Sequence, residues 1–450
     1  MPPFIALFLC IIFVICLYID DIRRQTRSSK AIWIPLVWLL IFGSRYVSEW
    51  LNTGVSFQSP EGYLEGSPLD RGILGILIAA GLFILLRRRI SWGQIFRNNK
   101  WVILYFMYCG MSIIWSDYSF VAGKSWVKGV GTLVMVLVVI TDRDPIGALK
   151  ALLRRWAYAL ISLSVVLIRY FPELGTYYDR VTGQAFYRGA GADKNMLGYL
   201  CLLCGLFFVW NLLTMWRHKA IFFDKKEISL DLFFLGMVCW VLSKTQSATS
   251  IGAFIAGTCI LIMLGLPVIK RSVEHLGLYI ILGAAIASIG FAFFDLYGFI
   301  LSALSRDETM TGRTDIWKTF LSFDSNPWIG VGYESFWEGS RAERLWREFG
   351  MRPNEAHNGY LEVYLNLGAI GLFFLIGIII KAYRNSRKAL LAEYEFGRFR
   401  IAFLGVALLY SISEVGFRGQ HPMWFIFLII AMKWPQPVGM PNAAIDRALP

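Results

Sequence analysis

The chain has 450 residues, of which 56% are hydrophobic and only 17% are charged, and its mean hydropathy is +0.55. A soluble domain is about half apolar and about a quarter charged, so this composition argues against a soluble protein. The formal net charge is +13, but the basic residues are spread over separate connections and form no single patch, which argues against nucleic acid binding.

Apolar runs of membrane-spanning length recur along the whole chain. They do not alternate residue by residue as the strands of a transmembrane β-barrel do. They predict an all-α polytopic integral membrane protein with about 12–13 transmembrane helices. The expected spans are residues 3–19, 31–48, 71–86, 101–116, 125–141, 153–171, 195–216, 229–243, 248–268, 277–300, 361–381, 399–416 and 421–433. The first span lacks a basic leading segment and a small-residue cleavage site, so we expect a retained helix and not a signal peptide.

Alternate connections between these spans are rich in lysine and arginine, which marks the cytoplasmic side. These connections are residues 23–30, 87–100, 143–155, 217–226, 270–271 and 381–400. If every span is present, the amino terminus lies outside and the carboxy terminus inside. Four polar regions then fall on the outer side, namely residues 172–194, 243–248, 301–360 and 416–422. Polar loops on one face of a helix bundle favour an extracytoplasmic site at the membrane surface.

The region of residues 301–360 is the longest stretch without a membrane-length apolar run. Its motifs are Gly312-Arg313-Thr314-Asp315-Ile316-Trp317, Asn326-Pro327-Trp328-Ile329-Gly330-Val331-Gly332 and His357-Asn358-Gly359-Tyr360-Leu361-Glu362. The last motif continues directly into the next apolar run. We therefore expect three regions: a helix bundle at 1–300, an outer catalytic loop at 301–360, and carboxy-terminal helices with a cytoplasmic tail at 361–450.

The sequence predicts neither a metal site nor a nucleotide site. The four histidines show no H-x-x-x-H spacing, and there is no P-loop. Gly330-Val331-Gly332 lacks the flanking strand and the third glycine of a dinucleotide fingerprint, so we interpret it as a turn. All seven cysteines fall inside apolar spans, which favours packing over redox chemistry. An enzyme here would use a substrate that is already activated, with no cofactor.

Three elements together resemble the Wzy-C signature, which is shared by O-antigen ligases, Wzy-type O-antigen polymerases and ExoQ-like exopolysaccharide polymerases. The outer loop supplies the first element through the motifs above, followed by Gly368 and Gly371. The second is the glycine-rich run 188–198, which contains Lys194-Asn195. The third is Thr245-Gln246-Ser247-Ala248-Thr249-Ser250, where Ala248 stands at the usual basic position and Lys244 is a nearby substitute.

This resemblance implies a GT-C-type glycosyltransferase fold with a large periplasmic loop, in a multi-pass protein of the bacterial inner (cytoplasmic) membrane. The implied reaction polymerises undecaprenyl-diphosphate-linked oligosaccharide repeat units into a surface polysaccharide, by metal-independent inverting transfer at the periplasmic face. The alternative within the family is an O-antigen ligase, which transfers a lipid-linked polysaccharide to lipid A-core. A chain-length regulator and export proteins are the implied protein partners.

The resemblance also implies roles for individual side chains. Arginine can meet phosphate oxygens with a fork of donors, so Arg188 and Arg313 are assigned to a clamp on the lipid diphosphate. His357, titrating near neutral pH, is assigned as the base that takes the proton of the acceptor hydroxyl. Arg313 could instead anchor an interfacial helix, and Arg180 competes with Arg188 in the same loop.

A further set of polar residues is assigned to substrate binding. Lys194 or Lys244 would assist the clamp, and Asn358 and Glu362 would orient the imidazole or bind sugar hydroxyls. The substrate-binding set is Lys194, Asn195, Lys244, Gln246, Asn358, Glu362, Arg341, Arg344 and Arg352. The last three belong to a segment at 336–349 and just beyond, whose helical spacing predicts an amphipathic helix on the outer leaflet. Its arginines either funnel the anionic lipid head group or form a solvated face.

Two rival functions come from other classes. A secondary transporter or flippase would carry a charged or broken helix at mid-membrane and repeat symmetry, and the sequence shows neither clearly. A non-catalytic component of a polysaccharide export complex would not require His357 and Arg313 together. Substituting both residues while expression is preserved separates this alternative from the enzyme.

Overall fold

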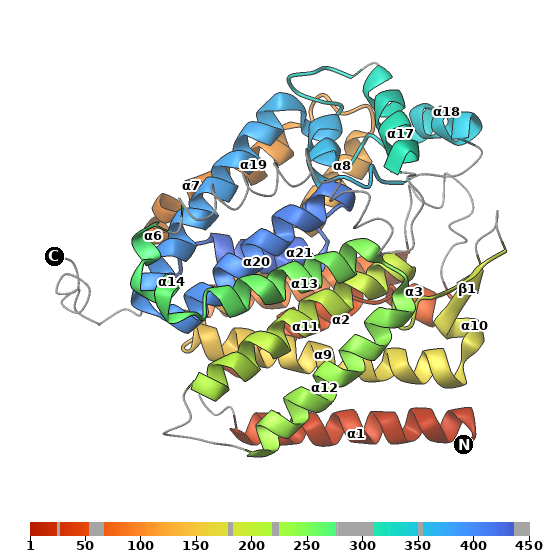
Figure 1. Ribbon diagram of the computed structural model, residues 1–450. Coiled ribbons are helices and arrows are strands. Elements are labelled where there is room, and N and C mark those ends of the chain that lie inside the picture. The colour runs from red at the N-terminus through yellow and green to blue at the C-terminus, as the bar shows by residue number, and fades with distance from the viewer. Residues whose placement is uncertain are drawn as a thin grey trace, which may run out of the picture.

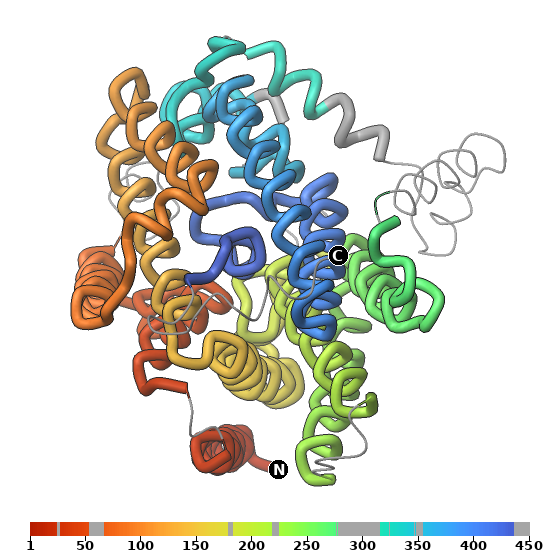
Figure 2. The backbone as a smooth tube through the Cα atoms, turned by 90° about the vertical axis from the view of Figure 1, so that its left-hand side faces the viewer, coloured from red at the N-terminus to blue at the C-terminus, as the bar shows by residue number. Residues whose placement is uncertain are grey.

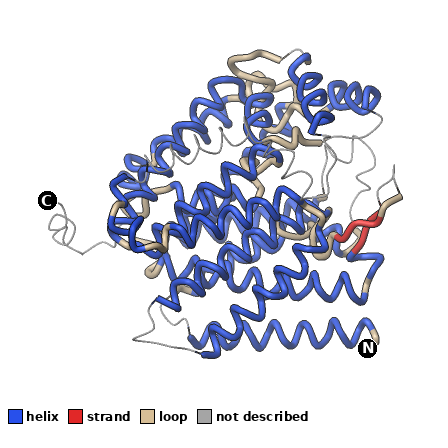
Figure 3. The backbone as a smooth tube through the Cα atoms, viewed as in Figure 1, coloured by secondary structure: helices blue, strands red, loops and turns tan. Residues whose placement is uncertain are grey.

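The computed structural model describes residues 1–24, 28–53, 67–178, 183–217, 225–275, 277, 310–323, 325–349 and 354–435. Nearly all of this described chain is helical, as Figure 3 shows. One short antiparallel hairpin is also present, formed by β1 (Thr176–Tyr178) and β2 (Ala185–Tyr187), with Thr176 opposite Tyr187. The fold class is therefore the expected one, an all-α polytopic membrane protein.

The helices follow the apolar runs of the sequence. The first group is α1 (Pro3–Arg24), α2 (Trp33–Phe42), α3 (Val47–Trp50), α5 (Pro68–Arg87), α6 (Trp92–Asn98), α7 (Lys100–Met111), α8 (Ser119–Ile140) and α9 (Pro145–Tyr170). The second group is α10 (Pro172–Gly175), α11 (Lys194–Arg217), α12 (Lys225–Thr245), α13 (Ala248–Met263) and α14 (Pro267–Arg271). The third group is α17 (Met310–Ser322), α18 (Gly339–Phe349), α19 (Gly359–Ala392), α20 (Tyr394–Ser413) and α21 (Pro422–Ala431). Two single 3-10 turns lie at Lys30–Ile32 and Val273–His275.

Eight helices in the described part of the chain are long and apolar enough to cross a membrane: α1, α5, α8, α9, α11, α12, α19 and α20. This is fewer than the 12–13 expected. The apolar helices α2, α13 and α21 are shorter than a span, and the run expected at 277–300 lies outside the described residues apart from Gly277. α21 is ten residues long and every one of them is buried, so its apolar run packs against protein on all sides.

The helices form layers around this buried segment. In Figure 1, α1, α9 and α12 lie on one side, α20 and α21 lie in the middle, and α7 and α19 lie beyond them. Figure 2 shows the blue carboxy-terminal helices surrounded by earlier parts of the chain. α1 lies at the edge, with three buried residues, Ala6, Leu17 and Asp21. Its apolar exposed face is what contact with lipid requires.

One helix break shapes the end of the bundle at which α19 begins. Gly368 in α19 has φ +65°, so the helical hydrogen bonds are interrupted there. The loop of residues 326–332 fills the gap: the N–H of Gly332 donates to the carbonyl of Asn366 at 2.9 Å, and the N–H of Ala369 donates to the carbonyl of Pro327 at 2.9 Å. Buried backbone groups need such partners, so the loop and the break stabilise each other.

Candidate active site

Residues in or next to the four polar regions that were predicted to lie outside meet at one end of the bundle. His357, just before α19, lies beside Glu414, just after α20. Asn195, in the first turn of α11, donates from Nδ2 to Glu414 Oε2 at 3.4 Å. Thr249, in the first turn of α13, shares a hydrogen bond with Ser413 through their hydroxyl oxygens at 2.9 Å. The segment at 413–414 is thus the point that joins the other three.

Two carboxylates hold the imidazole of His357. Its Nδ1 lies 3.0 Å from Glu355 Oε1 and 3.2 Å from Glu414 Oε2. The backbone of His357 has φ +47°, a left-handed conformation that costs free energy for a residue with a side chain. The Glu414 side chain is 5% exposed, whereas that of His357 is 43% exposed. The imidazole therefore has a buried anchor on one side and an open face on the other.

This arrangement decides the charge of His357. Partial burial lowers the pKa of the imidazole, but hydrogen bonds and charge interactions with Glu355 and Glu414 outweigh burial and raise the pKa to about 10. Burial raises the pKa of Glu355, but its hydrogen bond and charge interaction with His357 outweigh burial, so the net shift of this pKa is downward. The expectation that His357 titrates near neutrality is therefore wrong. At neutral pH it is an imidazolium between two carboxylates.

The neighbours of His357 are fixed by the loop's own packing. Glu362 is 4% exposed, accepts from Trp337 Nε1 at 2.7 Å, and accepts from the N–H of Ala356 at 2.8 Å. Asn358 caps α19, because its Oδ1 accepts from the N–H groups of Tyr360 and Leu361, each at 3.0 Å. These two side chains therefore hold the backbone on either side of His357.

The motif at 326–332 is structural as well. Gly330 has φ +64°, and an added Cβ would lie 2.4 Å from the carbonyl carbon of Asn366. Gly332 has φ +104°, and its Cβ would lie 2.5 Å from the Cβ of Ser116. The turn predicted for these glycines is present. Gly330 permits close contact with α19, and Gly332 permits close contact with Ser116.

The glycine-rich run 188–195 is held by an arginine from another segment. Buried Arg45 donates from Nε to the carbonyl of Gly191 at 2.9 Å and from a terminal nitrogen to the carbonyl of Gly189 at 3.1 Å. Arg188 donates from Nε to the carbonyl of Leu174 at 3.1 Å, so part of its guanidinium is used within its own loop. Burial lowers the pKa of Arg188, and the carboxylate of Glu49 opposes that shift. Lys194 lies with its Nζ 3.7 Å from the centre of the Phe186 ring.

The third polar segment forms a tight turn between α12 and α13. Ser247 caps α13 by accepting from the N–H of Ser250. Gln246 is exposed with φ +52°, and Lys244 is exposed at the end of α12. A Cβ on Gly198 of α11 would lie 2.6 Å from the hydroxyl oxygen of Ser250, so glycine permits the close approach of this turn to α11. The turn therefore meets both α11 and, through Thr249, the end of α20.

Comparison with known proteins matches this end of the molecule. A family model described as O-antigen ligase matches residues 231–376. Residues 231–376 are thus similar to the Wzy-C family. It is also 26% identical over 353 residues to the exopolysaccharide production protein ExoQ of Rhizobium meliloti (strain 1021), which covers 75% of this chain and 77% of that protein. The resemblance to the Wzy-C and ExoQ-like superfamily expected from the motifs is therefore confirmed.

The Wzy-C match includes His357 and Glu362 but ends before Glu414, and it begins after Asn195. Asn195 was assigned to substrate binding from the sequence, and the structure adds Glu414 to the site. Sequence reasoning missed Glu355 and Glu414, although a carboxylate at the end of the apolar run 399–416 is a signal, because acidic groups near membrane segments are costly and often functional. It also missed Arg418, which donates from Nε to Glu334 Oε2 at 2.7 Å and whose charge helps lower the pKa of Glu355.

His421, the other histidine that was predicted to lie outside, has a different role. Its Nδ1 accepts from the N–H of Met423 at 3.0 Å and so caps α21. Burial lowers its pKa to about 4, opposed by the carboxylate of Glu355, so the ring is neutral at pH 7. His421 therefore supports the fold beside the site.

The arginines assigned to substrate contact in the region 301–360 have different surroundings. Arg313 lies in the first turns of α17, and its side chain is outside the described part of the structure, as is all of Arg352. Arg341 pairs with Asp117 at 2.8 Å, with its side chain 15% exposed. Arg344 is exposed and lies 5.0 Å from the Phe323 ring. The predicted helix at 336–349 exists as α18, and Leu345 anchors it in a small core with Phe320 and Phe336.

One group of described residues has ligand atoms close enough for a metal ion. Glu355, His357 and Glu414 offer atoms within 4.8 Å of one another. Carboxylate and imidazole donors suit several divalent ions, so the donor set alone does not exclude a metal. The sequence also contains a D-x-D spacing, Asp142-Arg143-Asp144, which can bind metal ions in other proteins. Here Asp142 pairs with Arg88 at 2.9 Å and Asp144 caps α9, so both carboxylates have structural partners.

Proposed function

We propose that this protein polymerises lipid-diphosphate-linked oligosaccharide repeat units into an exopolysaccharide or O-antigen. The match to the Wzy-C family and the similarity to ExoQ support a polymerase or ligase of O-antigen or exopolysaccharide. The observation that carries the proposal is the junction at 413–414, where three segments resembling the family signature meet around His357. The site lies at the ends of membrane helices, where a substrate with a lipid tail and a polar head would present its glycosidic bond.

The chemistry proposed for this site is a single inverting displacement. An acceptor hydroxyl oxygen attacks the anomeric carbon of the donor sugar, and the bond from that carbon to the diphosphate oxygen breaks. The electron pair leaves with the diphosphate, and the hydroxyl proton passes to a carboxylate. Glu355 is the proposed acceptor of that proton, because its side chain is 26% exposed while that of Glu414 is 5% exposed. A carboxylate is a competent base in inverting sugar chemistry.

His357 is the charged partner of Glu355 in this scheme. The imidazolium lies 3.0 Å from Glu355 and orients this base toward the acceptor hydroxyl. The diphosphate departs from the opposite face of the anomeric carbon, so the negative charge that develops there is assigned to the arginine clamp. Glu414 holds the ring in place from its buried side, and Asn195 holds Glu414. The assignment of His357 as a neutral base is thereby replaced by a cationic role with Glu355 as base.

The remaining cations are proposed to bind the diphosphate before transfer. Arg313 is the main member of this clamp, since it lies within the Wzy-C match and keeps its charge near lipid. Arg188 contributes through the N–H groups that its own loop does not use. Lys194, Lys244 and Gln246 lie on the two segments that approach Glu414 and are proposed to contact the saccharide or the diphosphate.

We propose a bacterial inner membrane location with this site facing the periplasm. The opposite helix ends carry the paired basic residues, among them Arg155 with Asp21 at 2.6 Å and Arg88 with Asp142 at 2.9 Å. Basic connections mark the cytoplasmic side of a membrane. A chain-length regulator and export proteins remain proposed partners.

The second candidate is a ligase that transfers the polysaccharide to lipid A-core, and the description of the matching family model favours it. We place the polymerase first because ExoQ is named for exopolysaccharide production and the similarity to it extends over three quarters of both chains, whereas the family match is confined to residues 231–376. The two activities differ only in the acceptor.

Reconstitution tests the proposal. Purified protein in proteoliposomes receives a defined lipid-diphosphate-linked repeat unit as the sole saccharide. A ladder of products differing by one repeat unit is the expected result. Product that forms only after lipid A-core is added would identify the ligase. Absence of transfer with either acceptor, by protein that remains folded, would reject both.

A further inference from the structure

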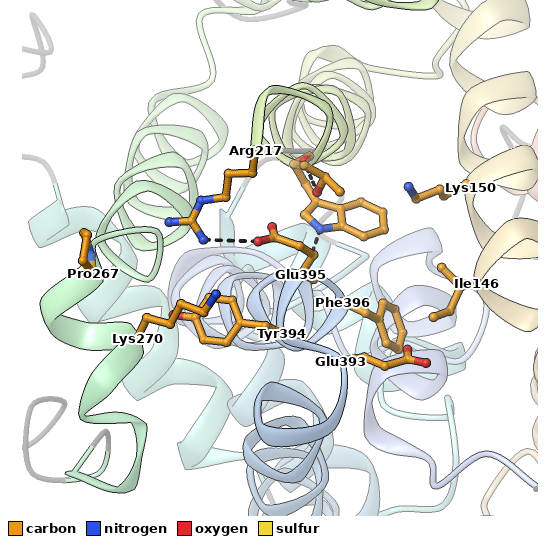
Figure 4. Close-up of a pocket in the computed structure, with 11 residues that line it drawn as sticks. Ile146, Lys150, Arg217, Pro267, Lys270, Glu393, Tyr394, Glu395 and Phe396 are labelled. Atoms are coloured by element: carbon orange, nitrogen blue, oxygen red, sulfur yellow. Dashed lines mark hydrogen bonds and ion pairs between the residues drawn. The ribbon is translucent and has the colours of Figure 1, made fainter. Parts of the chain in front are cut away.

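A cavity of about 670 Å³ lies at the end of the bundle opposite His357. It is bounded by the start of α9, the end of α11, α14 and the turn between α19 and α20. Figure 4 shows Lys150, Lys270 and Arg217 around it, with apolar Ile146 and Phe396 on one wall. Its lining thus combines cations with apolar and aromatic surface.

Two lysines in this cavity have aromatic partners and, among the described residues, no carboxylate at salt-bridge distance. Lys150 Nζ lies 4.9 Å from the centre of the Trp210 ring, and Lys270 Nζ lies 5.1 Å from that of Tyr394. In the described chain neither ammonium has a carboxylate oxygen within 4.0 Å. Their N–H donors are therefore available to an anion, and the rings fix the two side chains from behind.

The carboxylates in the lining do not remove this positive character. Glu395 is shared between Arg217 at 3.2 Å and Arg398 at 2.5 Å. Its backbone carbonyl also accepts from Trp210 Nε1 at 2.7 Å, which ties the end of α11 to the start of α20. Glu393 is the other lining carboxylate among the described residues, against the three cations Lys150, Arg217 and Lys270.

The position of the cavity points to a membrane surface. α11 runs for 24 residues from Lys194 to Arg217, and α20 runs for 20 residues from Tyr394 to Ser413. At a rise of about 1.5 Å per residue these helices are about 30–36 Å long, close to the thickness of the hydrocarbon core. Since their other ends carry Asn195 and Ser413, the cavity lies at the opposite lipid–water boundary. Tryptophan and tyrosine favour that boundary.

We propose that this cavity binds a phosphate group, and specifically the head group of an anionic phospholipid in that leaflet. Lys150 and Lys270 donate to the phosphate oxygens, and the apolar wall with Ile146, Pro267 and Phe396 accepts the adjoining glycerol and acyl chain. Basic pockets between membrane helices on the cytoplasmic side bind such head groups. A bound lipid would connect α9, α11, α14 and α20, and so would stabilise the helices whose far ends form the candidate active site.

Native mass spectrometry of the purified full chain tests this site. The protein is titrated with phosphatidylglycerol and, in parallel, with phosphatidylcholine of the same acyl chains. Wild type should retain phosphatidylglycerol preferentially, and Lys150→Gln and Lys270→Gln should each weaken its retention about fivefold, the loss expected for one lysine near an anionic lipid. The matched control is Lys388→Gln, an exposed lysine of α19 outside the cavity, which should behave as wild type.

Two further measurements separate loss of the binding site from loss of the fold, and a lipid from a soluble phosphate. Thermal unfolding in detergent without lipid shows whether each variant is folded, and Thr214→Trp fills the cavity without changing charge and should also lose the lipid. Displacement of the lipid by millimolar glycerol 3-phosphate would identify a soluble phosphate as the occupant through the same lysines. Equal retention of phosphatidylglycerol by wild type, both lysine variants and Thr214→Trp would overturn the proposal.

Discussion

His357 and Glu414 lie 57 positions apart in the chain, yet Nδ1 of one is 3.2 Å from Oε2 of the other. This contact joins the start of α19 to the end of α20, and Asn195 extends it to α11. The exposed imidazole is thereby tied to a buried carboxylate that belongs to a different helix. The charge of His357 and the packing of three helices are consequently linked.

The stability that the ion cluster around His357 gives to the fold should decrease as pH rises. The folded-state pKa of His357, about 10, is above the ordinary 6.5, so its contribution is fully present below pH 6.5 and is lost as pH rises through 10. We expect the unfolding temperature of wild type to fall over that interval more steeply than that of His357→Gln. Thermal unfolding at a series of pH values measures this. His275→Gln should follow wild type, and parallel curves for His357→Gln and wild type would contradict the ion cluster.

The break in α19 should not tolerate a side chain. At Gly368, φ is +65° and an added Cβ would lie 2.2 Å from the carbonyl carbon of Trp328. Gly368→Ala should destabilise the protein by at least about 1–3 kcal/mol, the usual cost of such backbone strain. Thermal unfolding in detergent reports the loss. Gly236→Ala in α12, whose Cβ would meet no atom within 4 Å, is the control, and equal stability of the two variants would refute the proposed docking of residues 326–332.

The rate of transfer should depend on the planar guanidinium of Arg313 as well as on its positive charge. Arg313→Lys keeps the positive charge but loses the two-pronged donor geometry, so transfer should fall strongly while the protein remains in the membrane. Arg313→Ala should lose more. Initial rates in proteoliposomes, normalised to inserted protein, provide the measurement. Normal turnover by Arg313→Ala would remove this residue from the diphosphate clamp.

Chelation should leave transfer intact. The proposed scheme places charge on His357 and the arginines, so it requires no ion among Glu355, His357 and Glu414. Activity of purified protein is compared before and after EDTA, followed by addition of Mg²⁺, Mn²⁺ or Ca²⁺. Complete loss that one divalent ion restores would show that the three side chains bind a metal during catalysis.

The helices could be predicted from the sequence. A chain in lipid must form its backbone hydrogen bonds within the helix, and side chains that face lipid must be apolar, so spanning helices appear as long apolar runs. Each expected span with substantially described residues contains a helix, but α2, α7, α13 and α21 are shorter than the spans expected at 31–48, 101–116, 248–268 and 421–433. The break at Gly368 could not be predicted, because residues 361–381 have the length and composition of one spanning helix despite the polar Glu362 and Asn366. Its cause is a loop that lies some forty residues earlier and supplies the missing hydrogen bonds.

The candidate site could be predicted only in part, because it too depends on contacts between segments far apart in the chain. The motifs pointed to His357, Asn195 and the turn at 245–250, and the structure places these around Ser413 and Glu414. Asn358 and Glu362 were expected at the substrate, but the first caps α19 and the second is buried against Trp337. Glu414 belongs to no motif, and its partner is set by how α20 packs on α11 and α19. Without that partner the pKa of His357 could not be inferred.

The central claim is that the cluster around His357 performs the transfer. The most direct measurement is the initial rate of ladder formation by His357→Gln in proteoliposomes, with binding of the lipid-linked donor measured in the same preparation. Glutamine can donate and accept hydrogen bonds but carries no charge. We predict a fall of at least about 100-fold, the usual scale for loss of one such catalytic group, with donor binding retained and with His275→Gln unchanged. A rate for His357→Gln close to that of wild type would contradict the claim.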